Sequence, residues 1–400
     1  MFRFLQFSDL HLDSNLNGSR LHYGPEKVRQ RVQELRDALA RICRLAGDEN
    51  VDAVLVPGDL MDDEACSLDT VNFIKECFAG IAPIPVVITP GNHDFYSSSS
   101  YYNSDLLVAQ RQTPWPDNVH LFTNDNFSVF SLPNRPDVSI TGICHVQNRD
   151  AGDRLLASPL PKGEGQFHIL LFHGSRLQFT PPGKKTTLPF TDAELIAQDF
   201  HYAAVGHYHT AMEVHDAHQR IRGAYSGCPV GRTLGESGPR VVFIGTLDEQ
   251  GHVTLEQRIV DRRVIHECDL DCTGAQSHEA VQAKIVAMVS EQNVQPEDIL
   301  YVRLKGRVPS GTSVNLQDDF LETPLFHCHI DKSNLLPDYD LDALLDAGGD
   351  HATTEARFVL AMQERLEKAV DDQERRVTTD ALYYGLDALH QTNVTPRHDH

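Results

Sequence analysis

The stretch Thr89-Pro90-Gly91-Asn92-His93-Asp94 directly follows an apolar run, Pro85-Val86-Val87-Ile88, which predicts a buried strand. Gly91 indicates a tight turn at the end of this strand, and the three residues after it offer an amide, an imidazole and a carboxylate. Asn and Asp also suit turns, so turn formation alone could explain the stretch. Similar residues follow four other predicted strands, however, and together these strand ends predict a site for two metal ions.

The segments before this stretch alternate between strand and helix. Apolar residues at three- and four-residue steps from Val28 to Leu45 predict the first helix, and Pro25 suits its first turn. This order is typical of a sheet with helices on its faces, in which ligands bind at the carboxyl ends of the strands. We expect strands at residues 2–8 and 53–56, and helices at about 25–46 and 68–79.

Further short strands are predicted up to about residue 260. They are expected at 119–122, 127–131, 138–143, 167–172, 202–205 and 219–225, with a hairpin at 241–247 and 253–259. A loop with a short helix is expected at 96–117, and a second short helix at 191–198. The strand at 167–172 leads into His173, and the strand at 202–205 leads into Gly206-His207-Tyr208-His209.

Eight residues just past the predicted strands carry metal-binding or acid–base chemistry. Carboxylate, amide oxygen and imidazole are suitable ligands for a divalent ion of intermediate hardness. Each residue taken alone also has an ordinary explanation as a turn, a cap or a buried core histidine, but the same pattern at successive strand ends favours a shared site. The eight residues are Asp9, His11, Asp59, Asn92, His93, His173, His207 and His209.

These motifs, in this order and spacing, resemble the calcineurin-like metallophosphoesterase superfamily over about residues 1–250. They are Asp9-x-His11, Gly58-Asp59, Gly91-Asn92-His93-Asp94, His173 and Gly206-His207-x-His209. Further stretches, among them Pro189–Leu195 and Gly231–Glu236, resemble the bacterial DNA-repair exonuclease branch, the SbcD- and YhaO-like proteins. Part of the C-terminal tail, Ala381–Leu389, resembles the last helix of the YhaO-like group.

The resemblance implies an α/β fold, a four-layer αββα sandwich followed by a small C-terminal α+β cap and terminal helices. It implies one metal ion held by Asp9, His11, Asp59 and His209, and another held by Asp59, Asn92, His173 and His207. A shared carboxylate would hold the two ions about 3.5–4 Å apart. His93 would face the scissile phosphate instead of binding metal, with Asp94 orienting it. Some nucleases of the family carry a histidine where this chain has Asp62.

The character of the chain changes near residue 265. Residues 1–264 are expected to form the metallophosphoesterase domain and 265–338 a small capping domain, with a helix at about 277–291 and a strand at 299–304. The remainder, 339–400, is expected to contain an acidic linker at 338–350 and one or two helices at 353–390. The apolar face of these helices could pack on its own chain, dock a partner or form a homodimer.

Composition limits the classes of function. The chain has 400 residues and a formal net charge of -22, so DNA binding would depend on local basic patches and on metal ions. Its eight cysteines include no C-x-x-C pair and favour buried thiols in a reducing compartment, with a zinc site at His266, Cys268 and Cys272 as the alternative. No signal-peptide pattern or long apolar run is found, so we expect a cytoplasmic protein without a membrane partner.

The favoured function is a metal-dependent phosphodiesterase, a hydrolase that cleaves DNA as a repair exonuclease or endonuclease does. Two divalent ions are expected as cofactors, manganese by preference, with magnesium, iron and zinc as alternatives. A first rival function is the same chemistry on a small phosphoester or cyclic nucleotide. A second rival is a binding subunit that scaffolds an ATPase through the C-terminal helices, and the resemblance implies an SMC-like ATPase as the partner.

Overall fold

The structure is a computed structural model that describes residues 1–16, 20–62, 65–146, 154–180, 186–309, 321, 323–346 and 353–390. The chain forms two compact units, Met1–His266 and Glu267–His400. The further division of the second unit at residue 338 stays a prediction. None of the helices in the described ranges is long and apolar enough to cross a lipid bilayer.

The first unit is built on two sheets that are each six-stranded within the described residues. In the first sheet the order is β12 (Val253–Ile259), β11 (Val241–Leu247), β1 (Phe2–Gln6), β2 (Ala53–Pro57), β3 (Val86–Thr89) and β4 (Val119–Leu121). In the second sheet the order is β5 (Ser128–Leu132), β6 (Arg135–Gly142), β7 (Phe167–His173), β8 (Tyr202–Gly206), β10 (Ile221–Tyr225) and β9 (Met212–His215). Strands β1 to β4 run parallel to one another, as do β6, β7, β8 and β10.

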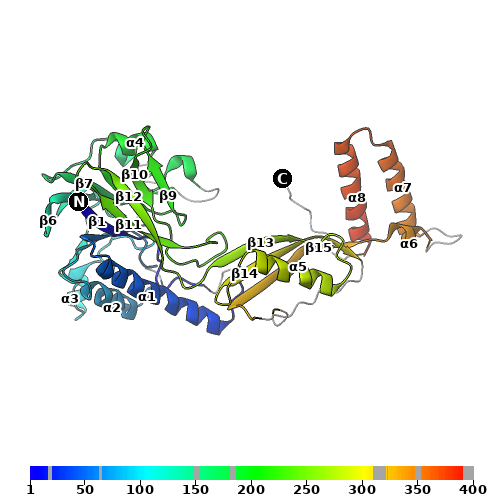
Figure 1. Ribbon diagram of the computed structural model, residues 1–400, viewed down its shortest axis with the longest axis horizontal. Coiled ribbons are helices and arrows are strands. Elements are labelled where there is room, and N and C mark those ends of the chain that lie inside the picture. The colour runs from blue at the N-terminus through cyan, green and yellow to red at the C-terminus, as the bar shows by residue number, and fades with distance from the viewer. Residues whose placement is uncertain are drawn as a thin grey trace. The chain divides into compact units, whose positions relative to one another are not determined.

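The two sheets pack face to face, and helices cover their outer faces. Alternate residues of each strand, such as Phe4 in β1 and Ile169 in β7, form the apolar layer between the sheets. The other face of the first sheet packs on α1 (Pro25–Asp48) and α2 (Leu68–Ala79), and α4 (Asp192–Ala197) packs on the second. Figure 1 shows these helices on opposite sides of the sheets. The predicted four-layer αββα sandwich is therefore confirmed.

Local signals explain why the predicted elements agree with the structure. Helix α1 begins at Pro25, buries the stripe from Val28 to Ala46 and ends only two residues after the predicted boundary. Helix α2 spans the predicted residues, and the Ser67 side chain caps it by accepting the backbone N–H of Thr70. The short helix expected within 96–117 is α3 (Ser104–Ala109), and short turns of 3-10 helix occur at Leu155–Ala157 and Leu177–Phe179.

In the second unit a small sheet packs on one helix. Strands β13 (Ile265–Asp271), β14 (Ile299–Pro309) and β15 (His327–Asp338) form this sheet, and α5 (His278–Glu291) packs on it. Cys272 is buried in their shared core, and Cys268 packs against it. Strand β15 was not predicted from the sequence, because its polar residues and Pro337 hide the strand pattern.

A helical hairpin completes the second unit. It consists of α7 (Thr354–Lys368) and α8 (Asp372–His390), and both elements agree with the helices expected at 353–390. The expected linker is wrong at residues 341–346, which form α6 (Leu341–Asp346) and pack through leucines on the hairpin. The hairpin is also tied to the sheet, because the Tyr383 hydroxyl donates to Asp338 at 3.0 Å and the Arg307 guanidinium stacks on the Tyr383 ring at 3.8 Å.

Candidate metal centre

Five strands deliver the predicted site residues to one edge of the sandwich. Asp9 and His11 follow β1, Asp59 follows β2, Asn92 follows β3, His173 ends β7, and His207 and His209 follow β8. Backbone hydrogen bonds join the first two turns, since the Asp9 N–H donates to the Gly58 carbonyl at 3.1 Å and the His11 N–H donates to the Asp59 carbonyl at 3.0 Å. The parallel strand order therefore brings together residues that lie up to 200 positions apart in the sequence.

The backbone of these turns is held in the left-handed region. The φ angles are 56° at Asp9, 48° at His11 and 52° at Asp59, and His207 has a φ of 110°. Non-glycine residues in sparsely populated regions cost on the order of 1–3 kcal/mol each, and such residues cluster at functional sites. Because this strained backbone costs stability, it indicates that the turns serve to position the side chains that they carry.

Two glycines make room for this packing. A Cβ atom on Gly91 would lie 2.3 Å from Oδ1 of Asp59, and one on Gly206 would lie 1.9 Å from the carbonyl oxygen of Pro57. Any side chain at either position would push a neighbouring strand end away. The glycines that precede the predicted ligands in the sequence are therefore required by the close approach of the strand ends.

Asp59 lies between histidines from two different strands. Its Oδ2 is 3.3 Å from Nε2 of His173 and 3.6 Å from Nε2 of His11, and its Oδ1 accepts the backbone N–H of His93 at 2.9 Å. Burial alone would raise the pKa of this carboxyl, but the nearby His173 and His11 outweigh burial and hold the pKa well below its ordinary value. Asp59 is therefore an ionised carboxylate that lies between the imidazole nitrogens of His173 on one side and His11 on the other.

Asn92 and His173 belong to the group on one side of Asp59, together with His207. The Asn92 Oδ1 lies 3.0 Å from Nε2 of His173 and 3.2 Å from Nδ1 of His207. On its other edge, Nδ1 of His173 is 2.9 Å from the Pro57 carbonyl oxygen, which fixes the ring. Burial would lower the pKa of His173, but the carboxylates of Asp59 and Asp9 raise it to about 9. A divalent cation would neutralise the same negative charge.

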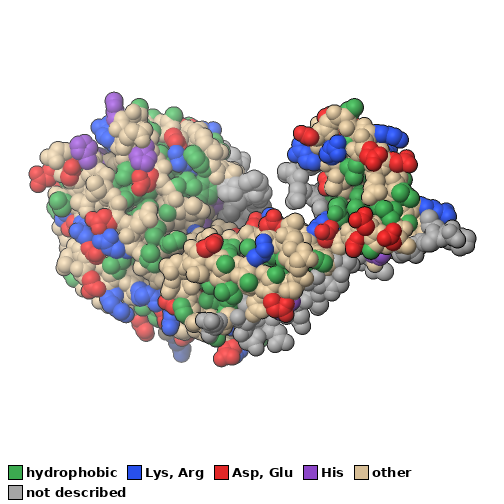
Figure 2. All heavy atoms as spheres, turned by 45° about the vertical axis from the view of Figure 1, so that its right-hand side comes forward, with side chains coloured by type: hydrophobic (Ala, Val, Ile, Leu, Met, Phe, Trp, Pro, Cys, Tyr) green, Lys and Arg blue, Asp and Glu red, His purple; other side chains and the backbone are tan. Residues whose placement is uncertain are grey.

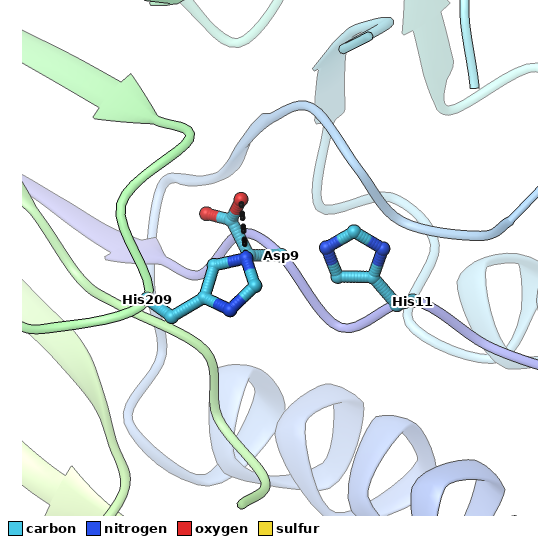
Figure 3. Close-up of side chains that lie close together, drawn as sticks. All are labelled: Asp9, His11 and His209. Carbon is cyan, nitrogen blue, oxygen red and sulfur yellow. Dashed lines mark ion pairs between the residues drawn. The ribbon is translucent and has the colours of Figure 1, made fainter. Parts of the chain in front are cut away.

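Asp9, His11 and His209 form the group on the other side, shown in Figure 3. The dashed line in that view joins Nε2 of His209 to Oδ1 of Asp9, which are 3.9 Å apart. Nε2 of His11 is buried and has no hydrogen-bond partner among the described residues, while its Nδ1 lies 2.6 Å from Oδ1 of Asp62. A buried imidazole nitrogen without a hydrogen bond is a suitable metal ligand, so this group also fits a divalent ion.

His93 and Asp94 occupy different environments. The His93 side chain is 54 % exposed, and its Nδ1 lies 3.4 Å from Oδ1 of Asp62. Asp94 is fully buried and accepts the backbone N–H groups of Asp59, Leu60 and Gly91 at 3.1, 2.8 and 2.6 Å. The expected orientation of His93 by Asp94 is therefore corrected. Asp62 is the carboxylate beside His93, and the Asp94 carboxylate is occupied in holding the turn that carries Asp59.

Tyr102 completes the surroundings of Asp94. Its hydroxyl donates to Oδ2 of Asp94 at 2.7 Å, and the tyrosine is buried. Burial, and then the charge of Asp59, raise the pKa of Asp94 to about 6. Each carboxylate oxygen is used by backbone or hydroxyl donors, so the contribution of Asp94 to the centre is the position of Asp59.

Glu236 is a residue of this centre that the sequence analysis did not identify. Its Oε1 lies 2.7 Å from Nδ1 of His209, and the Arg232 guanidinium donates to the same oxygen at 3.1 Å. Burial would raise the pKa of Glu236, but Arg232 and His209 outweigh burial and hold it well below its ordinary value. Both residues lie in the stretch Gly231–Glu236, which the sequence marked only as a family resemblance. A carboxylate in this position orients a metal-binding histidine.

A cleft of about 620 Å³ opens beside the centre. Asp62, His209 and Glu236 line it next to the centre, and Tyr208, Met212 and Leu234 add apolar lining. Phe179 lies at its rim with 49 % of its surface exposed, and the Arg176 guanidinium stacks on the ring at 4.0 Å. Arg176 is itself fixed by Asp192 through two 2.6 Å contacts. The cleft is large enough for more than a phosphate group.

Residues 2–211 match the sequence model of the calcineurin-like phosphoesterase family. The chain belongs to this family. Members of the family are metal-dependent hydrolases that bind two divalent ions, and the two groups on either side of Asp59 provide ligand clusters of the required kind in this phosphoesterase.

Three relatives extend the comparison. The phosphoesterase is 26% identical over 390 residues to the uncharacterized metallophosphoesterase YhaO of Bacillus subtilis, a match that covers 96% of this chain and 85% of YhaO. It is 28% identical over 228 residues to the DNA double-strand break repair protein Mre11 of Sulfurisphaera tokodaii, covering 52% of this chain and 48% of Mre11. It is 23% identical over 277 residues to a subunit of the nuclease SbcCD of Bacillus subtilis, covering 59% of this chain and 63% of that protein.

Proposed function

We propose that this phosphoesterase uses two divalent ions, manganese by preference, to hydrolyse phosphodiester bonds in DNA. The observation that carries the proposal is the position of Asp59, whose Oδ2 lies 3.3 Å from His173 and 3.6 Å from His11. One ion would be held by Asp9, His11, Asp59 and His209, and the other by Asp59, Asn92, His173 and His207. Asp59 is then the shared ligand.

The chemistry divides between the ions and the chain. Two bound ions would supply Lewis acidity and a water molecule with a lowered pKa. His93 presents an exposed imidazole next to the centre, where it donates a proton to the leaving oxygen. The Asp62 carboxylate, 3.4 Å from Nδ1 of His93, orients that ring beside the centre. Asp94 and Glu236 hold Asp59 and His209 in place.

Two observations support a DNA substrate. The cleft beside the centre carries an exposed aromatic ring, Phe179, stiffened by Arg176, and such a ring can stack on a nucleobase. Two of the relatives are a DNA repair protein and part of a nuclease. Neither observation depends on a large basic surface. Lys184 and Lys185, the next cationic residues after Arg176 in the sequence, lie outside the described residues.

The surface charge supports the rival, a small phosphoester or cyclic nucleotide as substrate. The net charge is -22, and on the face seen in Figure 2 Lys and Arg side chains are interspersed with Asp and Glu. Affinity for DNA falls steeply with salt, because each phosphate contact releases counterions. Between 50 and 200 mM salt, the affinity of proteins with many phosphate contacts typically falls about 10³–10⁵-fold. Over this range (about fourfold in salt), KM for a short DNA duplex should therefore rise steeply, whereas KM for a small ester should change little.

The C-terminal helices support a proposed protein partner, an SMC-like ATPase. Leu360 in α7 is 48 % exposed, and Val377 and Leu389 in α8 are 62 % and 44 % exposed, although the buried side of the hairpin is already packed. One relative is by name a subunit of a larger nuclease. A homodimer through the same apolar residues is the alternative outcome of a size measurement.

The eight cysteines, all described and all thiols, support a reducing, cytoplasmic compartment.

The test of the proposed function uses two substrates and one chelator. Purified protein with Mn²⁺ is incubated with end-labelled DNA and with bis-p-nitrophenyl phosphate, in parallel with EDTA and with the Asp59→Asn variant. We expect both substrates to be cleaved, and both reactions to stop with EDTA and in the variant. Turnover of the small ester alone would replace DNA by a small substrate, and turnover that persists in EDTA would contradict the metal mechanism.

A further inference from the structure

A second polar pocket, of about 340 Å³, lies at the opposite end of the sandwich from the metal centre. Gln166, His201 and Arg222 line it at the starts of β7, β8 and β10, whereas His173 and His207 follow the ends of β7 and β8. The turn between β11 and β12 closes the pocket, and Leu247 at the end of β11 pairs with Phe2 at the start of β1. The pocket is therefore separated from the metal centre by the full length of the strands.

Arg222 is the residue that points to a ligand. Its side chain is only 16 % exposed, and its Nε is buried with no hydrogen-bond partner among the described residues. The anion nearest to its guanidinium is Oδ1 of Asp199 at 3.4 Å, and the Asp199 side chain is 86 % exposed. Burying a charged group is costly unless it is paired and hydrogen-bonded. A guanidinium that is mostly buried, with one long contact to a solvated carboxylate, has donors left for another anion.

The neighbours of Arg222 add further donors. Lys162 lies 3.8 Å from the Asp199 carboxylate, and Arg220 is fixed by the buried carboxylate of Asp216 at 2.8 Å. Because Asp216 neutralises Arg220, the pocket sets two further cationic side chains, Lys162 and Arg222, against Asp199, the one carboxylate among its lining residues, in a chain whose net charge is -22. General attraction of anions to such a protein is weak, so this local excess of positive charge is a specific feature of the pocket.

His201 is held so that it presents a proton donor. Its Nδ1 accepts the backbone N–H of His168 at 3.1 Å, which assigns the ring proton to Nε2. Gly251 has a φ of +82°, and a Cβ atom there would lie 2.8 Å from Cδ2 of His201, so glycine allows the turn to approach the ring. The pocket thus combines a guanidinium, an ammonium group and a fixed imidazole N–H.

We propose that this pocket binds a phosphate group, as the terminal phosphate of a nucleotide or of a DNA end. Arginine suits phosphate because its planar fork donates two parallel hydrogen bonds, and Lys162 and His201 supply donors from other directions. A volume of about 340 Å³ holds a phosphate with part of a nucleoside. The pocket contains none of the residues assigned to the metal centre, so this inference stands apart from the proposed function.

Binding is tested on metal-free full-length protein in EDTA, with inorganic phosphate as the probe and titration calorimetry as the readout. We expect saturable binding at one site that weakens at least tenfold in Arg222→Met, with Lys162→Met as a second variant. Arg258→Met is the matched control, because Arg258 is a partly exposed arginine paired with Glu256 on β12. Equal phosphate affinity in wild type, Arg222→Met and Lys162→Met, at unchanged melting temperatures, would overturn the proposal, as would the absence of saturable binding.

Two further probes separate the sources of the phosphate. Tighter binding of dAMP than of inorganic phosphate would assign a nucleotide, and tighter binding of a 5′-phosphorylated oligonucleotide than of its unphosphorylated copy would assign a DNA end. Hydrolysis of bis-p-nitrophenyl phosphate with Mn²⁺ should be unchanged in Arg222→Met. Loss of this hydrolysis in Arg222→Met, at an unchanged melting temperature, would contradict the separation of the two sites.

Discussion

The two halves of the proposed metal centre differ in how their candidate ligands are held. In the half formed by Asn92, His173 and His207, neighbouring ligand atoms lie 3.0 and 3.2 Å apart, and the Pro57 carbonyl fixes one ring. In the other half, Nε2 of His209 lies 3.9 Å from Asp9, and its side chain is 21 % exposed. There the His209 ring is held by the side chain of Glu236, and Glu236 is itself held by Arg232. The first half is built into the strand ends, whereas the second also needs a supporting loop.

The largest expected effect comes from the residue that the halves share. Asp59→Ala should lose both ions, because the Asp59 carboxylate lies 3.3 Å from His173 in one half and 3.6 Å from His11 in the other. His209→Ala should weaken one ion and leave the other bound. Elemental analysis of the purified variants measures both outcomes. Two ions retained in Asp59→Ala would rule out the shared carboxylate.

The next effect concerns catalysis without loss of metal. His93→Ala should retain both ions while turnover falls by roughly 10²–10⁴-fold, the range for a lost general acid. Asp62→Asn should reduce turnover less, because the imidazole remains and only its charged neighbour is removed. Asp62 also contacts Nδ1 of His11, so metal content is measured in both variants. If His93→Ala loses metal together with activity, His93 is a ligand and its assigned role is wrong.

A smaller effect separates the halves of the centre. Glu236→Ala should weaken the affinity for one of the two ions by roughly 10–100-fold, the usual cost of removing a group that orients a metal-binding histidine. Glu236→Gln should recover part of the loss, since the amide oxygen can still accept from Nδ1 of His209. Calorimetric titration with Mn²⁺ resolves the two ions. An equal loss for both ions, or none, would show that the supporting loop does not serve one half selectively.

The smallest effect concerns the charged residues that pack against the start of the supporting loop, Gly231–Glu236. Glu34 in α1 lies against Arg263 and Arg31, and the Arg31 guanidinium donates to the Gly231 carbonyl. Burial would raise the pKa of Glu34, but hydrogen bonds and charge from Arg263 and Arg31 outweigh it and lower the pKa below its ordinary 4.5. A lowered pKa in the folded state stabilises the protein above pH 4.5, and this contribution is lost as the pH falls through the folded-state pKa.

The contribution of Glu34 to stability is measured from melting temperatures between pH 6 and pH 3, a span of about 3 units around the ordinary carboxyl pKa values. We expect the melting temperature of the wild type to fall more steeply below pH 4.5 than that of Glu34→Gln, which cannot bind the extra proton. Glu26→Gln, at an exposed position in the first turn of α1, is the matched control and should follow the wild type. Parallel curves for wild type and Glu34→Gln would contradict the linkage.

Most of the sandwich could be predicted because its strands are apolar runs that end in chemically distinctive residues. The ligand candidates were found for the same reason, since Asp9, Asp59 and Asn92 each follow such a run directly. The supporting residues carried no such signal. Glu236 lies 27 positions from His209 in the sequence, and only the fold brings them together. The pairing of His93 with Asp62 instead of the adjacent Asp94 likewise depends on how two turns pack.

The errors in the second unit have a different physical cause. Residues 341–346 have leucines at helical spacing, Leu341, Leu344 and Leu345, but three aspartates around them suggested a solvated linker. The helix gains its stability from packing those leucines on α7 and α8, which a local pattern does not contain. Strand β15 gains its stability from parallel pairing with β14, a contact across about 28 residues.

The shared position of Asp59 is tested most directly by electron paramagnetic resonance of the Mn²⁺-loaded protein. Two Mn²⁺ ions joined by one carboxylate, about 3.5–4 Å apart, are exchange-coupled. The account predicts a coupled dimanganese spectrum at two ions per chain, replaced by the spectrum of isolated Mn²⁺ when only one ion is added. Spectra of two isolated ions at full loading would contradict a shared carboxylate and with it the proposed centre.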